Sequence, residues 1–256
     1  VSRKIGKAIV MSMFCRVIPV FRPLGLTIAI LLCLSQASTA AAAKTIYWGR
    51  AKRTVVLDPG HGGADSGARS PDGTLEKQVA LDLSRLIAAE FDGPYRVQLT
   101  RTDDYRLEIE RRTDIANTLK ADVFISIHAG GSFSPIPGGS AIYCYKETAS
   151  EHLPYPDRSP DTLGNWDRIQ LKHVRTSHLL ARHLKDRLDP LINTEVLDAP
   201  VLVLQGADMP AVLIEVGYLS NPEEAKALRD SKHLEEVARA VSSGIKAFFE
   251  DLRKEK

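Results

Sequence analysis

One stretch organises the rest of the chain: Thr54-Val55-Val56-Leu57-Asp58-Pro59-Gly60-His61-Gly62-Gly63. Its first four residues form a short β-branched and apolar run, which favours a buried strand. Asp-Pro-Gly follows at once, and this turn chemistry stops a strand. The sequence therefore predicts a strand over 54–57 and places His61 in a glycine-rich turn directly after it.

Strand and helix patterns alternate along the chain beyond this turn. A helix is predicted over 75–91, where Leu75, Val79 and Leu83 share one face. Further strands are predicted over 96–100, 122–127, 140–145, 201–204 and 212–216, and further helices over 107–119, 167–188, 222–229 and 234–252. This alternation predicts a single α/β domain, with about six strands in a largely parallel sheet and helices on both of its faces.

Residues 1–43 have the three parts of a secretory signal peptide. Residues 1–23 hold five basic residues and no acid, residues 24–34 are apolar, and residues 36–43 are small and neutral. The apolar run is too short to span a bilayer comfortably, and this order of parts is typical of an exported protein. We therefore expect a leader over 1–43, a folded domain over 44–256 and no stable membrane span after cleavage. An uncleaved N-terminal anchor is the alternative.

The net charge does not indicate a nucleic-acid-binding protein. The whole chain carries a formal charge of +2. Without the five basic residues of the leader, 29 Lys and Arg remain against 32 Asp and Glu, so the net charge is negative. The basic excess belongs to the leader, so we expect no nucleic-acid partner.

Of the three cysteines only Cys144 lies beyond residue 43. We therefore expect no intrachain disulfide in the exported chain and a packed thiol at Cys144.

Polar side chains occur where the predicted strands end. His61 follows the first strand, His128 follows the strand over 122–127, and Glu215 ends an apolar run. Glu76 opens the helix that follows the first strand. Because open α/β sheets bind ligands at the carboxyl ends of their strands, these groups can converge. Two neutral imidazoles and one carboxylate suit Zn²⁺ with a fourth position open for water.

Each of these residues also has a purely structural interpretation. His61 could be an exposed turn residue, and His128 a strand-end histidine satisfied by its neighbours. Glu76 could favour the helix dipole in the first turn, with Thr74 as the N-cap. Glu215 is harder to explain structurally, since a carboxylate that ends an apolar run is costly to bury without a partner. We expect the other five histidines to be solvated or capping residues: His152, His173, His178, His183 and His233.

Several blocks of the sequence, taken in order, resemble the zinc-dependent N-acetylmuramoyl-L-alanine amidases of bacterial cell walls. The blocks are 55–63 with 65–68, Glu76-Lys77, 99–101 with Asp104, 112–117, 121–129, and 210–221 with Pro222 and Glu224. The resemblance runs from about residue 54 to residue 249. One departure is visible: the family often has Asn or Asp two residues after the second ligand histidine, where this chain has Gly130.

This resemblance implies a fold, a cofactor and a reaction. The implied fold is a single α/β domain with a mixed sheet flanked by helices. One Zn²⁺ would be bound by His61, Glu76 and His128, while Glu215 would accept a proton from water and deliver it to the leaving amine. The implied reaction is hydrolysis of the amide between N-acetylmuramic acid and L-alanine in peptidoglycan. Export to the periplasm or cell-wall space fits this substrate, and we expect a monomer.

Two other functions stay open from the sequence. A zinc carboxypeptidase or endopeptidase acting on the stem peptide would use the same types of ligand. A non-catalytic cell-wall-binding module would be expected to have lost a metal ligand or the catalytic carboxylate, and all four residues are present.

The resemblance also raises the question of an activator. Some members of the family carry an inserted helix that plugs the zinc site until a partner removes it. Here the only space for such an insert is 146–165, which holds Pro154, Pro156 and Pro160. Because proline inside a helix breaks it, we predict that no plug forms and that no activator protein is required.

Overall fold

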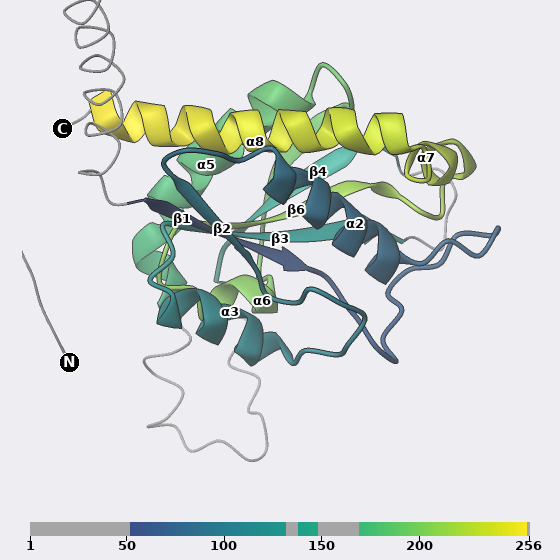
Figure 1. The fold of residues 1–256 in the computed structure, drawn as a ribbon, viewed down its shortest axis with the longest axis horizontal. Coiled ribbons are helices and arrows are strands. Elements are labelled where there is room, and N and C mark those ends of the chain that lie inside the picture. The colour runs from purple at the N-terminus through teal and green to yellow at the C-terminus, as the bar shows by residue number, and fades with distance from the viewer. Residues whose placement is uncertain (1–51, 132–137, 148–168, 255–256) are drawn as a thin grey trace, which may run out of the picture. The chain divides into compact units, whose positions relative to one another are not determined.

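The computed structural model describes residues 52–131, 138–147 and 169–254. These residues contain one six-stranded sheet, with the strand order β2-β1-β3-β6-β4-β5 (Figure 1). The strands are β1 (Arg53–Pro59), β2 (Tyr95–Leu99), β3 (Val123–Gly130), β4 (Ser140–Tyr145), β5 (Thr194–Ala199) and β6 (Ala211–Tyr218). β1 runs parallel to β2 and β3, and β3 runs parallel to β6. β4 is antiparallel to β6 and parallel to β5, which confirms the mixed, mostly parallel sheet.

Helices cover both faces of this sheet. They are α2 (Glu76–Ala89), α3 (Ile109–Thr118), α5 (Val174–Leu188), α6 (Leu202–Gln205), α7 (Pro222–Ala227) and α8 (Ser231–Lys254), with a 3₁₀ helix η1 at Gln170–His173. α2, α5 and α8 bury their apolar sides in one core, and α3 and α6 contribute to a second core. Figure 1 shows α8 running beside α5 and α2, as the packing of these helices requires.

The alternation of side chains along β1 explains why two cores form. Val55 and Leu57 lie in the core under α2, α5 and α8, whereas Val56 lies in the core under α3 and α6. All three residues are fully buried. A strand buried on both faces loses its polar alternation and becomes a continuous apolar run, which is the pattern that the sequence shows at this position.

One predicted strand is wrong and one strand was missed. The strand predicted over 201–204 is instead the single helical turn α6, because a short apolar run does not by itself distinguish a strand from a buried helical turn. The missed strand is β5, an edge strand whose residues are mostly exposed or half-buried, so it lacks a strong apolar pattern. The helix predicted over 167–188 begins, within the described residues, as η1 and becomes regular only at Val174.

Several sequence predictions fall outside the described residues. These are the leader over 1–43, the position of His152, and the proline-containing segment, of which only Lys146 and Glu147 are described.

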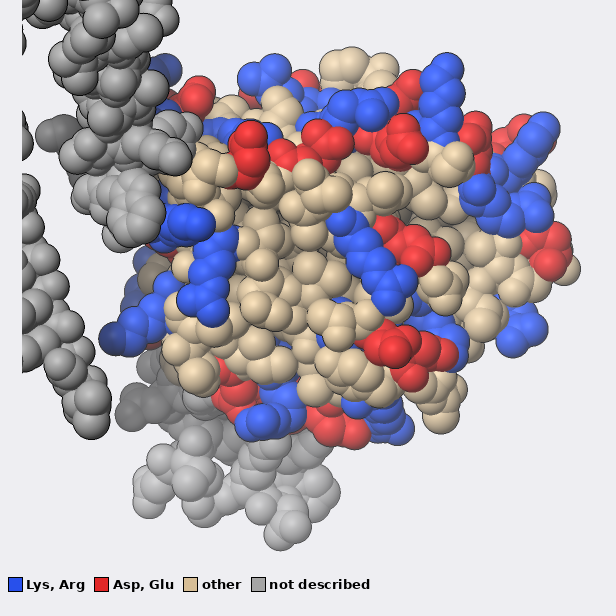
Figure 2. Space-filling model, viewed as in Figure 1, with Lys and Arg blue, Asp and Glu red and all other residues tan. Residues whose placement is uncertain are grey.

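Within the described residues, none of the helices combines the length and the apolar character that crossing a membrane requires. On the face shown in Figure 2, basic and acidic side chains are interspersed.

Candidate active site

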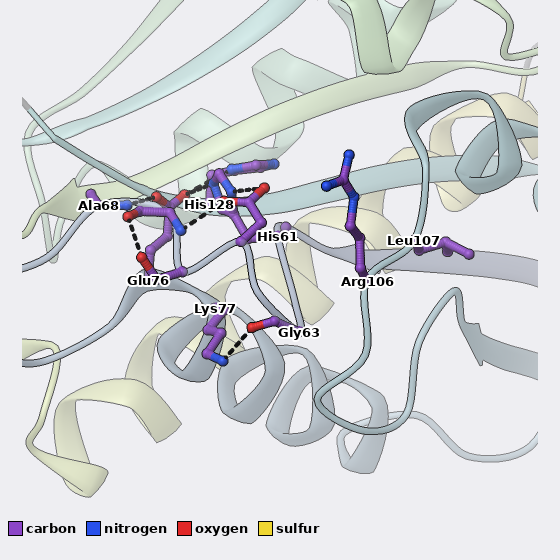
Figure 3. A network of polar contacts seen from close by, with 12 residues as sticks. His61, Gly63, Ala68, Glu76, Lys77, Arg106, Leu107 and His128 are labelled. Carbon is purple, nitrogen blue, oxygen red and sulfur yellow. Dashed lines mark hydrogen bonds and ion pairs between the residues drawn. The ribbon is translucent and has the colours of Figure 1, made fainter.

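Three of the predicted site residues meet at the carboxyl edge of the sheet. His61 follows β1, His128 lies near the end of β3, and Glu76 is the first residue of α2. β3 is longer than predicted, so His128 lies inside the strand and not after it. Glu76 Oε1 is 3.0 Å from His61 Nε2 and 2.8 Å from His128 Nδ1. Figure 3 shows the three side chains pointing toward one another.

The donor atoms of these residues fit a single metal ion. One donor atom from each of His61, Glu76 and His128 lies within 4.8 Å of the other two, and this is the candidate cluster of the described residues. Two imidazoles and one carboxylate are a common protein ligand set for a catalytic zinc site. The side chains of His61 and His128 are 24% and 17% exposed, so the cluster is partly accessible to solvent. This accessibility is what a fourth ligand from solvent requires.

Glu76 is held in place by its surroundings. Its Oε2 accepts a hydrogen bond from the backbone N–H of Ala68 at 2.7 Å, and its Oε1 accepts one from that of Ala129 at 3.2 Å. Burial by itself would raise the pKa of Glu76, but the hydrogen bonds and charges of His128 and His61 outweigh it and hold the pKa well below its usual range. Glu76 is therefore an ionised carboxylate between two imidazoles.

The capping interpretation of Glu76 finds less support. The N-cap of α2 is Leu75, not Thr74, and no side chain caps this helix end. Glu76 is only 4% exposed, whereas a carboxylate that merely complements a helix dipole needs no burial.

His61 is oriented by Asp65, a residue to which the sequence analysis gave no role of its own. His61 Nδ1 lies 2.9 Å from Asp65 Oδ2, which leaves Nε2 to face Glu76. Burial lowers the pKa of His61, but the hydrogen bonds and charges of Glu76 and Asp65 raise it above its ordinary value. A carboxylate that binds the second nitrogen of a ligand histidine fixes the orientation of the ring. The available signal in the sequence was an acid four residues after the histidine in a glycine-rich turn.

The backbone around His61 is unusual and depends on glycine. His61 has φ +58°, a left-handed conformation that costs a residue with a Cβ roughly 1–2 kcal/mol. A Cβ at Gly60 would lie 2.6 Å from His128 Nδ1, and a Cβ at Gly67 would lie 2.8 Å from the Cβ of Glu76. Only glycine therefore allows the loop to approach the two other cluster residues this closely.

Glu215 lies beside the cluster without belonging to it. β6 pairs with β3 so that Glu215 is the direct register neighbour of His128. Its Oε2 is buried and has no hydrogen-bonding partner among the described residues. Burial is the main reason that the pKa of Glu215 is raised to about 7; the charge of Glu76 adds to the rise, while His128 and His61 oppose it. Glu215 is thus a carboxyl group that can bind and release a proton near neutral pH.

The four other histidines within the described residues are not part of the candidate cluster. His173, His178 and His183 lie on η1 and α5 and pair with the acids Asp208, Asp198 and Asp251, respectively. His233 lies on α8.

Two other sequence observations have clear physical explanations. Cys144 is fully buried, and burial raises its pKa to about 12, so it is the packed thiol that was predicted. At Gly130, where the chain departs from the family pattern, a Cβ would lie 2.8 Å from the ring of Tyr218 and 3.3 Å from Glu215 Oε2. Tyr218 thus occupies space that a larger residue at this position would need.

Comparison with known sequences gives one family. The sequence profile of the N-acetylmuramoyl-L-alanine amidase family (Amidase_3) matches residues 55–247. The N-acetylmuramoyl-L-alanine amidase AmiC of Escherichia coli O6:H1 is 31% identical over 220 residues, which are 77% of this chain and 53% of that protein. The probable cell wall amidase LytH of Staphylococcus epidermidis is 33% identical over 203 residues, 77% of this chain and 58% of that protein.

Solved structures give the same result. The catalytic domain of the N-acetylmuramoyl-L-alanine amidase CwlV from Bacillus (Paenibacillus) polymyxa var. colistinus has a TM-score of 0.64 at 29% identity, with 77% of this chain and 98% of that chain covered. The N-acetylmuramoyl-L-alanine amidase AmiC2 of Nostoc punctiforme has a TM-score of 0.62 at 28% identity, with 79% and 99% covered. The chain spans about half the length of the AmiC relatives that it matches. It belongs to the N-acetylmuramoyl-L-alanine amidase family.

Proposed function

We propose that this chain is a zinc-dependent N-acetylmuramoyl-L-alanine amidase. It hydrolyses the amide between the lactyl group of N-acetylmuramic acid and the L-alanine of the stem peptide in peptidoglycan. The observation that carries the proposal is the His61–Glu76–His128 cluster, with Glu215 beside it, whose Oε2 has no hydrogen-bonding partner among the described residues. Membership of the family supports the choice of substrate and bond.

His61, Glu76 and His128 would hold the metal ion. A bound Zn²⁺ supplies a Lewis acid that lowers the pKa of water and polarises a carbonyl group. Asp65 keeps the ring of His61 oriented, and the backbone N–H groups of Ala68 and Ala129 keep the carboxylate of Glu76 oriented. Ligands held in this way need little rearrangement to bind the ion.

Glu215 would move the proton during the reaction. Its carboxylate accepts a proton as water adds to the carbonyl carbon, and it returns that proton to the amide nitrogen as the C–N bond breaks. The products are a carboxylic acid on the muramic acid and a free amine on the L-alanine. A general base is most efficient with a pKa near the working pH, and the burial that raises the pKa of Glu215 to about 7 in the metal-free protein moves it in this direction.

We also propose that the enzyme is exported and that it acts as a monomer. Peptidoglycan lies outside the cytoplasmic membrane, so the enzyme would act in the periplasm or the cell-wall space. The leader expected over 1–43 supports this location.

The products of digestion test the proposal directly. We would incubate the chain without its leader with purified peptidoglycan, with and without a chelator, and identify the products by mass. The expected products are intact stem peptides with a free L-alanine amine and glycan strands that have lost them. Free amino acids or shortened stem peptides would indicate a carboxypeptidase or endopeptidase. Binding to the wall without any product, with zinc supplied, would indicate a non-catalytic module.

A further inference from the structure

Two buried arginines bind the backbone of the loop that carries His61. Arg112 on α3 donates to the carbonyl oxygen of His61 at 2.9 Å and to that of Pro59 at 2.7 Å. Arg101, which follows β2, donates to the carbonyl oxygen of Pro59 at 3.0 Å and to that of Gly60 at 2.6 Å. Three consecutive carbonyl groups, from Pro59 to His61, therefore accept hydrogen bonds from two guanidinium groups.

Arg112 is itself fixed by a buried carboxylate. Its Nη1 donates to Asp58 Oδ1 at 2.8 Å, and its Nε donates to the carbonyl oxygen of Leu107 at 3.2 Å. Asp58 is fully buried and also accepts hydrogen bonds from the hydroxyl groups of Thr100 and Ser126. A guanidinium with this many partners has one orientation, because its donors lie in a rigid plane.

An ion pair between Lys77 and Asp104 binds the same loop at Gly63. Gly63 donates its N–H to Asp104 Oδ1 at 2.8 Å and accepts from Lys77 Nζ at 2.7 Å. Lys77 and Asp104 are joined at 2.7 Å, and Lys77 directly follows Glu76 on α2 (Figure 3). The carbonyl groups on both sides of the left-handed turn at His61 are thus bound by cationic side chains.

We propose that Arg112 is a positioning residue of the metal site. By holding the carbonyl group of His61, it keeps this residue in the left-handed conformation that directs Nε2 toward Glu76 and His128. Asp58 acts indirectly, because its carboxylate binds Arg112 and orients it. The inference rests on the proposed function only in assuming that the cluster binds zinc.

A purely structural role makes a different prediction. If Arg112 only stabilised the packing of α3 against β1, a folded variant would bind metal as tightly as the wild type. If Arg112 positions His61, a folded variant binds metal more weakly. Zinc affinity measured on folded protein therefore separates the two roles.

The experiment compares Arg112→Met and Arg112→Lys with Arg111→Met as the matched control. Arg111 neighbours Arg112 on α3, but its side chain is 69% exposed and pairs only with Asp114 among the described residues. Folding is checked by circular dichroism, and the dissociation constant for Zn²⁺ is measured by competition with a chromophoric chelator. We expect both Arg112 variants to bind Zn²⁺ about 10–100-fold more weakly, the usual effect of losing an outer-shell partner of a ligand. Lysine is expected to fail because one ammonium does not reproduce the planar fork of donors.

A spectroscopic measurement makes the test independent of activity. In the Co²⁺-substituted protein, we expect the visible absorption bands of Arg112→Lys to differ from those of the wild type and of Arg111→Met. If Arg112→Met does not fold, Arg112→Lys, which keeps a cation beside Asp58, decides the question. A folded Arg112→Lys with wild-type zinc affinity and wild-type bands would overturn the inference. If the wild type itself binds no Zn²⁺, the proposed function fails instead.

Discussion

Glu215 and His128 are direct neighbours across the ladder between β6 and β3, at the edge of the sheet where the candidate metal-binding cluster lies. This pairing places a carboxyl group with a pKa of about 7 beside one of the three candidate ligands. Neighbouring parallel strands bring the two residues together although 87 positions separate them in the sequence. This register therefore places the proposed proton-transferring group next to a proposed metal ligand.

Chelation is expected to abolish hydrolysis of peptidoglycan, and added Zn²⁺ to restore it. His128→Ala removes one of three donors, so we expect it to lose both zinc binding and turnover. His173→Ala is the control, because His173 pairs with Asp208 and is not part of the cluster. Bound zinc and released stem peptides are measured for each variant. Full activity of His128→Ala at trace metal would remove this residue from the site.

Glu215→Gln keeps the size of the side chain but removes its base. We expect turnover to fall by about 10²–10⁴-fold, the usual contribution of a general acid–base group, while zinc binding is kept. Turnover and zinc content are measured on the same sample. Loss of zinc together with activity would instead make Glu215 a ligand or a structural acid.

The stability of the metal-free protein should depend on the titration of Glu215. Its pKa rises from 4.5 to about 7 on folding, so between these values the folded state binds more protons than the unfolded state. The free energy of unfolding contributed by Glu215 therefore falls as the pH rises through this window. A shift of this size corresponds to a penalty on the order of 3 kcal/mol above the folded pKa, absent below the unfolded pKa.

Glu215→Gln has no such titration, which makes it the comparison for this effect. Urea unfolding of both proteins, in the presence of chelator, is measured at about pH 4 and at about pH 8. The variant should gain stability relative to the wild type as the pH increases. A difference between the two proteins that does not change with pH would show that Glu215 does not titrate in this window.

Asp65→Asn should weaken zinc binding without preventing folding. Asp65 is an exposed side chain, and its contact with His61 Nδ1 at 2.9 Å orients the ligand ring. We expect a loss of about 10–100-fold in zinc affinity, as is usual for the partner of a ligand histidine. Asp82→Asn on the exposed side of α2 is the control. Equal zinc affinities of the two variants would leave Asp65 without a role at the site.

The purified chain without its leader should be active with zinc alone, without an activator protein. The three prolines at 154, 156 and 160 oppose the long helix that a plug would require. Release of stem peptides is compared between this chain and a variant lacking 148–160. Activity that appears only after the deletion, with zinc bound in both proteins, would identify this segment as an autoinhibitor.

Local patterns in the sequence were sufficient for most of the secondary structure and for the expectation that His61, Glu76 and His128 converge. Val55, Val56 and Leu57 are buried on both faces of the sheet, so they form an uninterrupted apolar run that identifies a central strand. His61, His128 and Glu215 occur at or near the ends of such runs, and the carboxyl ends of parallel strands meet at one edge. The strand predictions succeeded because a central strand is buried on both faces, which makes consecutive residues apolar.

Tertiary structure alone decided the features that depend on distant contacts. α6 is helical and β5 is a strand because of where they pack, and neither has a local pattern strong enough to show it. The hydrogen bond from Arg112 to His61 joins residues 51 positions apart. The burial of Glu215 Oε2, and with it the raised pKa, likewise comes from elements brought together by folding. The residue types were set by the sequence, whereas their orientation and protonation depend on neighbours that only the folded chain supplies.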